Sequence, residues 1–154
     1  MRKLALSTAV LLALTVAACS KPAEQAAAPA AAPAAAPAET AESDMQAALA
    51  RHVTAVKAGD VDGILADYAD DATMVLMPGP LWPDGALVGK TEVKKFFDWL
   101  KGPEILPGAQ SMVVTTKKIG PNTMYFHFTQ FPGTPKEVKG FDIYTFRDGK
   151  IVFQ

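Results

Sequence analysis

The side chains best suited to proton transfer in this sequence are His52, His127 and Asp142. Asp142 lies in a run of aromatic and aliphatic residues, where a carboxylate without a partner would be costly. His52 falls on the apolar stripe of a segment with helical periodicity, three residues after Leu49. A carboxylate partner raises the basicity of an imidazole, so a His52–Asp142 pair would be a general base near neutral pH. The alternative is a hydrogen-bonded core histidine with Asp142 as its partner.

Strand parity predicts which other polar side chains share a cavity with Asp142. Side chains alternate along a strand, so Tyr144 points inward if Asp142 does. A turn at 132–135 would send Tyr125 and His127 into the same cavity from the preceding strand. We therefore predict that Tyr125, His127 and Tyr144 contact a ligand, with Tyr68 and Trp82 as further ligand-binding candidates. The same register sends the apolar residues Met124, Phe126, Phe128, Phe141 and Ile143 outward, which predicts a homodimer through that face.

No pattern in the sequence indicates a cofactor or a metal. Gly89-Lys90-Thr91 resembles the end of a phosphate-binding loop, but position 84 is Asp where the first glycine belongs. The single cysteine excludes an internal disulfide and a zinc site built on several thiolates. The two histidines with Asp142 match the composition of a two-histidine, one-carboxylate iron site, an alternative that we do not adopt. The net charge of −1 and the absence of clustered Lys and Arg argue against nucleic acid as a partner.

The elements that must position these residues follow from periodicity. Helical spacing predicts helices from Asp44 to Gly59, from Val61 to Tyr68, and around Val93 to Leu100. Alternation predicts strands at 73–77, 111–119, 123–131 and 136–147, with a last one after Asp148-Gly149. Helices followed by strands indicate an α+β fold. Trp82 lies in a proline-rich loop and is either a lid over the cavity or an anchor of the loop.

The first 41 residues have a different character. Residues 1–18 combine a basic start with an apolar run that is too short to span a membrane, and they end in Val16-Ala17-Ala18 before Cys19. This segment resembles a bacterial lipoprotein signal, which implies that Cys19 carries lipid. A plain secretory signal with an incidental cysteine is the alternative. Residues 19–41 are rich in Ala and Pro and predict an extended tether, so the domain is 42–154.

The ordered motifs of 42–154 resemble those of the nuclear transport factor 2-like superfamily. They are Gly59-Asp60, the run Tyr68 to Thr73, Gly89 before the helix with Phe96-Phe97, and the segment from Asp142 to Ile151. The SnoaL-like and ketosteroid isomerase-like branches are the most similar. The resemblance implies a cone-shaped roll, in which a curved antiparallel sheet and three N-terminal helices enclose a pocket.

The isomerase site transfers only in part onto this sequence. The resemblance places His52 where the isomerase has its oxygen-binding tyrosine, Asp142 at the second acid, and Tyr68 at the supporting tyrosine. The general base falls on Leu76 or Met77, which cannot accept a proton. The sequence ends at Gln154, before the family's last strand normally ends, so we expect no cavity residue from that segment.

Two functions therefore remain open. The first is an envelope lipoprotein, anchored through Cys19, whose domain binds a small apolar ligand or a protein partner. Ser20 after the lipidated cysteine indicates the outer membrane, facing the periplasm, if the source is Gram-negative. The second is a SnoaL-like or isomerase-like enzyme that uses His52 and Asp142 for proton transfer on a small carbonyl compound. The missing base favours the first.

Overall fold

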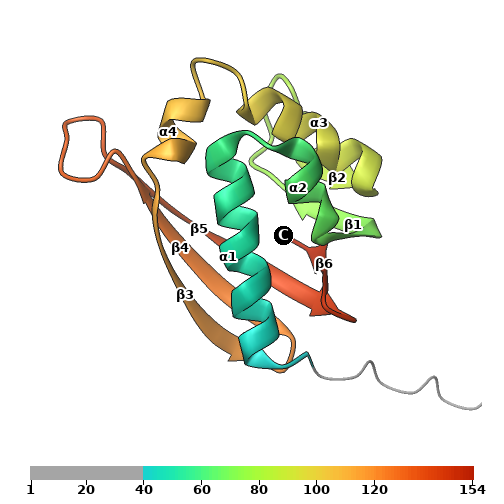
Figure 1. Ribbon diagram of the computed structural model, residues 1–154. Helices are drawn as coiled ribbons and strands as arrows, with labels where there is room; N and C mark the ends of the chain where they lie inside the picture. The colour runs from blue at the N-terminus through green and yellow to red at the C-terminus, as the bar shows by residue number, and fades with distance from the viewer. Residues whose placement is uncertain (1–39) are drawn as a thin grey trace, which may run out of the picture. The chain divides into compact units, whose positions relative to one another are not determined.

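The computed structural model describes residues 40–154, and Figure 1 shows the arrangement of their helices and strands. Cys19 and the predicted signal and tether lie outside these residues. The helices are α1 (Glu42–Ala58), α2 (Val61–Ala66), α3 (Lys90–Leu100) and α4 (Leu106–Gln110). The strands are β1 (Tyr68–Val75), β2 (Ala86–Val88), β3 (Val113–Gly120), β4 (Thr123–Gln130), β5 (Val138–Arg147) and β6 (Lys150–Phe153). Within this part of the chain, no helix is long and apolar enough to cross a membrane.

The strands form one curved, open sheet in the order β2-β1-β6-β5-β4-β3. Neighbouring strands are antiparallel except β1 and β6, which are parallel. Helix α1 runs along the concave face, and α3 packs against β1 and β2. This arrangement confirms the predicted α+β class and the curved sheet with helices on one side.

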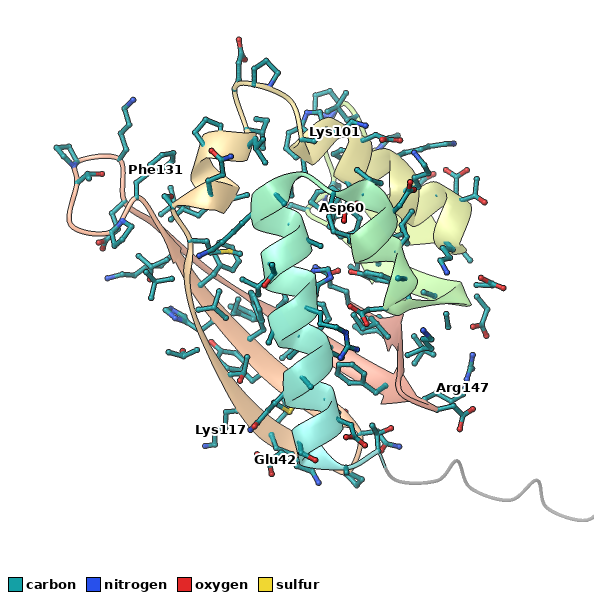
Figure 2. The ribbon with its side chains drawn as sticks, viewed as in Figure 1. Glu42, Asp60, Lys101, Lys117, Phe131 and Arg147 are labelled. Carbon is teal, nitrogen blue, oxygen red and sulfur yellow. The ribbon has the colours of Figure 1, made fainter. Side chains whose placement is uncertain are left out.

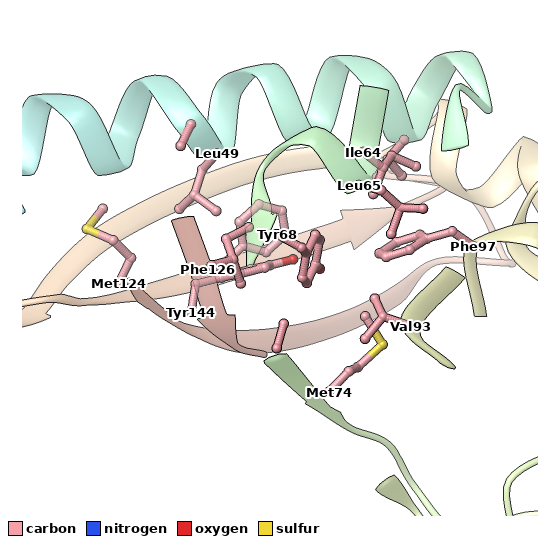
Figure 3. Close-up of a cluster of buried hydrophobic side chains, with 14 of the residues drawn as sticks. Leu49, Ile64, Leu65, Tyr68, Met74, Val93, Phe97, Met124, Phe126 and Tyr144 are labelled. Atoms are coloured by element: carbon pink, nitrogen blue, oxygen red, sulfur yellow. The ribbon is translucent and has the colours of Figure 1, made fainter. Parts of the chain in front are cut away.

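The core lies between α1, α2, α3 and the concave face of the sheet (Figure 3). One face of α1 buries Met45, Leu49, His52 and Val56, which recur at helical spacing. Residues of the sheet that meet this face include Met124, Phe126 and Tyr144.

A sharp corner joins α1 to α2. Gly59 adopts a left-handed backbone with φ of 68°, a conformation that glycine adopts without steric cost, and its N–H bonds to carbonyls of the last turn of α1. Asp60 then caps α2, because its side chain accepts a hydrogen bond from the Gly63 N–H at 3.0 Å. The second helix ends at Ala66, not at the predicted Tyr68, which already starts β1. The helix α4 and the short strand β2 were not predicted.

The connection between β4 and β5 corrects the predicted strand register. Gln130 pairs with Val138 and Phe126 pairs with Asp142, so the loop spans residues 131–137 (Figure 2). Phe131 takes a left-handed φ of 50°, and the Glu137 carboxylate accepts a hydrogen bond from the Gly133 N–H at 2.8 Å. This loop shifts the pairing by one residue relative to a turn centred on 132–135.

Every side chain of β4 therefore changes face. Tyr125 and His127 pair with Ile143 and Phe141, on the convex side, so their predicted cavity placement is wrong. The apolar residues of β4 that we predicted to face outward instead line the concave side: Met124, Phe126 and Phe128. Asp142 and Tyr144 do point inward, as predicted.

Candidate functional site

A cavity of about 160 Å³ lies between the concave face of the sheet and the helices α1, α3 and α4. Its walls are mostly apolar, which suits a small apolar molecule. The apolar lining residues are Val56, Val75, Leu76, Phe96, Phe97, Leu100, Ala109, Met112, Phe126 and Phe128. The polar lining residues are His52, Gln130, Asp142, Tyr144 and Gln154.

Four of these polar residues, with Tyr68 behind them, form two hydrogen-bonded groups. The Tyr144 hydroxyl lies 3.4 Å from His52 Nε2. The side chain of Gln154 hydrogen-bonds to the Asp142 carboxylate, and its Oε1 accepts a hydrogen bond from the Tyr68 hydroxyl. Among the described residues, no hydrogen bond joins His52 directly to Asp142, so the two groups meet at the cavity as separate units.

His52 is a buried imidazole in an aromatic setting. Its ring centroid lies 5.8 Å from that of Tyr68, 5.7 Å from that of Phe97 and 5.6 Å from that of Tyr144. Burial lowers the pKa of His52 from 6.5 to about 4, although the nearby charge of Asp67 acts in the opposite direction. The imidazole is therefore neutral near pH 7 and a weaker base than a free histidine, so the structure gives no support to the raised basicity expected of a His52–Asp142 pair.

The Asp142 carboxyl has the opposite perturbation. Burial raises its pKa from 3.8 to about 6, and the hydrogen bond to Gln154 limits that rise. Asp142 therefore changes its charge state just below neutral pH. A carboxyl in this range can accept a hydrogen bond when ionised, and can donate one when protonated.

Comparison with known families now places the domain. The family model of the SnoaL-like domain matches residues 49–154, which include all the cavity-lining residues. The chain belongs to the SnoaL-like domain family. A search of curated protein sequences finds no match.

Solved structures share the fold of this SnoaL-like domain. An NTF-2 like protein of unknown function from Burkholderia xenovorans has a TM-score of 0.55 and 24% identity, over 73% of this chain and 80% of that one. A Mycobacterium tuberculosis protein in complex with estradiol-17beta-hemisuccinate has a TM-score of 0.52 and 24% identity, over 71% and 89%. A Mycobacterium sp. Delta 5-3-ketosteroid isomerase has a TM-score of 0.51 and 24% identity, over 71% and 88%.

The SnoaL-like domain brings together only part of the predicted site. His52, Asp142 and Tyr144 line the cavity. Tyr68 is fully buried behind it and reaches the cavity through Gln154. Trp82 packs against Phe96, with 5.5 Å between ring centroids, and against Trp99 at 5.4 Å. Phe96 lies in the cavity wall, so Trp82 supports that wall from outside and matches the loop-anchor alternative.

The two histidines lie on opposite faces of the sheet. His52 projects from α1 toward the concave side, whereas His127 pairs with Phe141 on the convex side. They cannot act on one ligand or one metal ion together, so the iron-site alternative has no geometric basis. Within residues 40–154, no three side chains of the His, Cys, Asp or Glu type are grouped closely enough to hold a metal ion.

Gln154 is the functional candidate that sequence reasoning missed. It follows β6, and its backbone is held by β1: the Gln154 N–H donates to the Thr73 carbonyl at 3.0 Å, and its own carbonyl accepts from the Val75 N–H at 2.8 Å. This placement depends on the parallel pairing of β1 with β6. Because those strands are separated by most of the domain sequence, no local signal identifies Gln154.

Proposed function

We propose that this SnoaL-like domain binds a small, mostly apolar molecule that presents one oxygen function to the polar side chains of the cavity. The observation that carries the proposal is the composition of the cavity, in which apolar walls surround a small set of hydrogen-bonding groups: His52, Asp142, Tyr144 and Gln154. His52 also supports it, because Nδ1 has no hydrogen-bond partner among the described residues although the side chain is only 2% exposed. A small rotation of the ring would let a ligand supply the partner that this buried nitrogen lacks.

The chemistry of the proposed ligand agrees with the Mycobacterium tuberculosis complex. Estradiol-17beta-hemisuccinate, bound to that protein, combines a large apolar skeleton with oxygen groups. The cavity here has the same two kinds of surface. We therefore infer a ligand class, an apolar skeleton with a hydroxyl or carbonyl oxygen.

Calorimetric titration with para-butylphenol and with estradiol tests this proposal. The full chain would carry Cys19→Ser, so that no acyl chain competes for the cavity. His52→Ala should weaken binding about tenfold, because it removes one hydrogen-bonding group and a wall of the cavity. His127→Ala is the matched control and should bind as the parent does, since His127 faces away. Failure of both probes to bind, or equal losses in the two variants, would contradict the proposal.

Proton-transfer catalysis is the second candidate, and the pKa of Asp142, about 6, favours it. In the proposed reaction the Asp142 carboxylate, in place of His52, removes a proton from the carbon beside a carbonyl and later returns one. Exchange of cyclohexanone protons in deuterated water, followed by NMR, would detect such a step. The rate should rise with pH through about 6 and disappear in Asp142→Asn. A rate equal to that of buffer alone would reject this candidate.

We propose further that the chain is an envelope lipoprotein anchored through Cys19, in the outer membrane facing the periplasm if the source is Gram-negative. The support is the sequence alone, in which the single cysteine follows Val16-Ala17-Ala18. A multiply acylated cysteine anchors stably because each buried CH₂ contributes about 0.8 kcal/mol. Expression in a bacterium followed by fractionation should place the parent in the membrane and Cys19→Ser in the soluble fraction. An unchanged distribution would exclude the anchor.

A second copy of the chain is the protein partner that we propose. The convex face of the sheet exposes Phe141 at 63% and Val113 at 56%, and Tyr125 stacks on Phe141 with ring centroids 5.7 Å apart. Large apolar side chains gathered on one sheet face favour association. Phe141 and Ile143 face outward as expected from the sequence, whereas the apolar side chains of β4 point inward and cannot contribute to this interface.

A further inference from the structure

Phe128 and Gly140 form a cross-strand pair on the concave face of the sheet. They are directly opposite each other on β4 and β5. The phenyl ring lies over the glycine so closely that a Cβ added to Gly140 would meet Cε1 of Phe128 at 2.8 Å, with Cζ closer still. No side chain larger than hydrogen fits at position 140 unless the ring moves. The backbone of Gly140 is outside the left-handed region, so its φ does not require glycine.

The ring of Phe128 is also part of the cavity wall. A side chain at position 140 stands up from the same face of the sheet, so it pushes the ring away from the sheet, on the side where the cavity lies. Gly140 lies two residues before Asp142 on β5, which separates the two positions by about 7 Å along the strand. A ligand whose oxygen reaches Asp142 and whose apolar part runs along β5 toward Gly140 passes Phe128 once that part extends beyond this distance.

We propose that Gly140, by letting the Phe128 ring lie flat on the sheet, sets the length of the apolar ligand that the cavity accepts. This inference rests on the proposed binding function and adds a specificity-determining pair to it. A side chain at position 140 lifts the ring into the path of the ligand's apolar part. Short ligands, which end before Phe128, are unaffected.

The competing explanation is that Gly140 serves only the bending of β5, since glycines often mark bends in curved sheets. The two explanations differ in what a second change at Phe128 does. If the ring is the obstacle, removing it restores binding in the presence of an alanine at position 140. If glycine is required for the bend of β5, removing the ring does not restore ligand binding to the variant with alanine at position 140. A double-mutant cycle therefore separates them.

The experiment titrates para-alkylphenols, from para-cresol to para-hexylphenol, into the full chain carrying Cys19→Ser. Gly140→Ala should bind para-cresol as the parent does and para-hexylphenol about tenfold more weakly, as expected for an overpacked wall. Phe128→Ala together with Gly140→Ala should regain para-hexylphenol binding. Gly120→Ala is the matched control, because a Cβ there meets Thr123 at an ordinary 3.4 Å.

Two results would overturn the inference. One is a Gly140→Ala variant that binds the whole series as the parent does. The other is a loss for short and long probes alike that the Phe128→Ala change does not reverse. If Gly140→Ala alone does not fold, the double variant with Phe128→Ala decides, since removal of the ring should restore both folding and para-hexylphenol binding, whereas a glycine required for the bend would leave the double variant unfolded. A parent that binds para-cresol but shows none of these length effects refutes the inference alone, whereas a parent that binds no probe refutes the proposed function as well.

Discussion

At the scale of single residues, His52 and Asp142 titrate in the same pH range with opposite effects on stability. Asp142 binds its proton more tightly in the folded chain than in the unfolded chain, so its contribution to stability falls as pH rises from 3.8 to about 6. His52 binds its proton less tightly when folded, so its contribution rises as pH increases from about 4 to 6.5. The two contributions largely cancel in the parent chain.

Single substitutions should remove this cancellation. As pH rises from 4 to 6.5, the free energy of unfolding of Asp142→Asn should increase relative to that of the parent, because only the His52 contribution remains. That of His52→Gln should decrease relative to the parent, because only the Asp142 contribution remains. The expected change is about 3 kcal/mol in each case, from roughly 1.4 kcal/mol per pKa unit. Urea unfolding at several pH values measures it. Parallel pH profiles for the parent and both variants would show that the two groups are not perturbed.

Gln154 should control the acidity of Asp142. The hydrogen bond from Gln154 favours the ionised carboxylate, so Gln154→Leu should raise the pKa of Asp142 above about 6. The same change leaves the buried Tyr68 hydroxyl without its partner, which should cost about 1–3 kcal/mol of stability. NMR titration of the Asp142 carboxyl carbon and urea unfolding check the two effects. Phe153→Leu, one residue earlier and 38% exposed, is the control and should leave the pKa unchanged.

At the scale of elements, the corner between α1 and α2 positions the residues behind the cavity. Asp60 caps α2, and α2 leads directly to Tyr68. Asp60→Ala removes the hydrogen bond to the Gly63 N–H and should destabilise the fold by about 1 kcal/mol. Asp62→Ala, in the first turn of the same helix, removes a charge but no cap, and should cost less. Thermal unfolding of the two variants tests this order; a larger loss for Asp62→Ala would contradict it.

The loop at 131–137 determines which side chains of β4 line the cavity. Alternation within β4 was evident from the sequence, because Met124, Phe126 and Phe128 recur at every second position. Either these residues or the alternate ones, among them Tyr125 and His127, face the cavity, and the number of residues in the loop decides which. The loop geometry rests on Phe131 and Gly133 with positive φ and on the Gly133–Glu137 hydrogen bond. Phenylalanine rarely adopts a positive φ, so the sequence does not indicate this conformation at Phe131.

At the scale of the whole molecule, the proposed dimer depends on the convex face. Phe141→Lys places a charge where the apolar face would be covered, so the variant should sediment as a monomer at concentrations at which the parent is a dimer. Val138→Lys is the matched control, because Val138 is 52% exposed on the same strand but has the parity of the concave side. Both variants would carry Cys19→Ser. A parent that sediments as a monomer at micromolar concentration would rule out the dimer.

The sequence by itself determined the elements and the chemistry that they carry. Periodicity located α1, α3 and the C-terminal strands, and the ordered motifs from Gly59 to Ile151 identified the family. The periodicity of each element and each single motif are local signals, because they depend on residues close together in the chain. His52 and Asp142 were found in the same way, as polar residues within apolar stripes.

Tertiary structure alone decided which side chains meet and how strongly each holds a proton. The strand pairing turned Tyr125 and His127 away from the cavity, and the parallel contact of β6 with β1 brought in Gln154. The direction of the pKa change at His52 was also a tertiary result, because its aromatic neighbours come from three separate elements of the fold. Desolvation depends on everything that surrounds a group, and a sequence pattern describes only the neighbours along the chain.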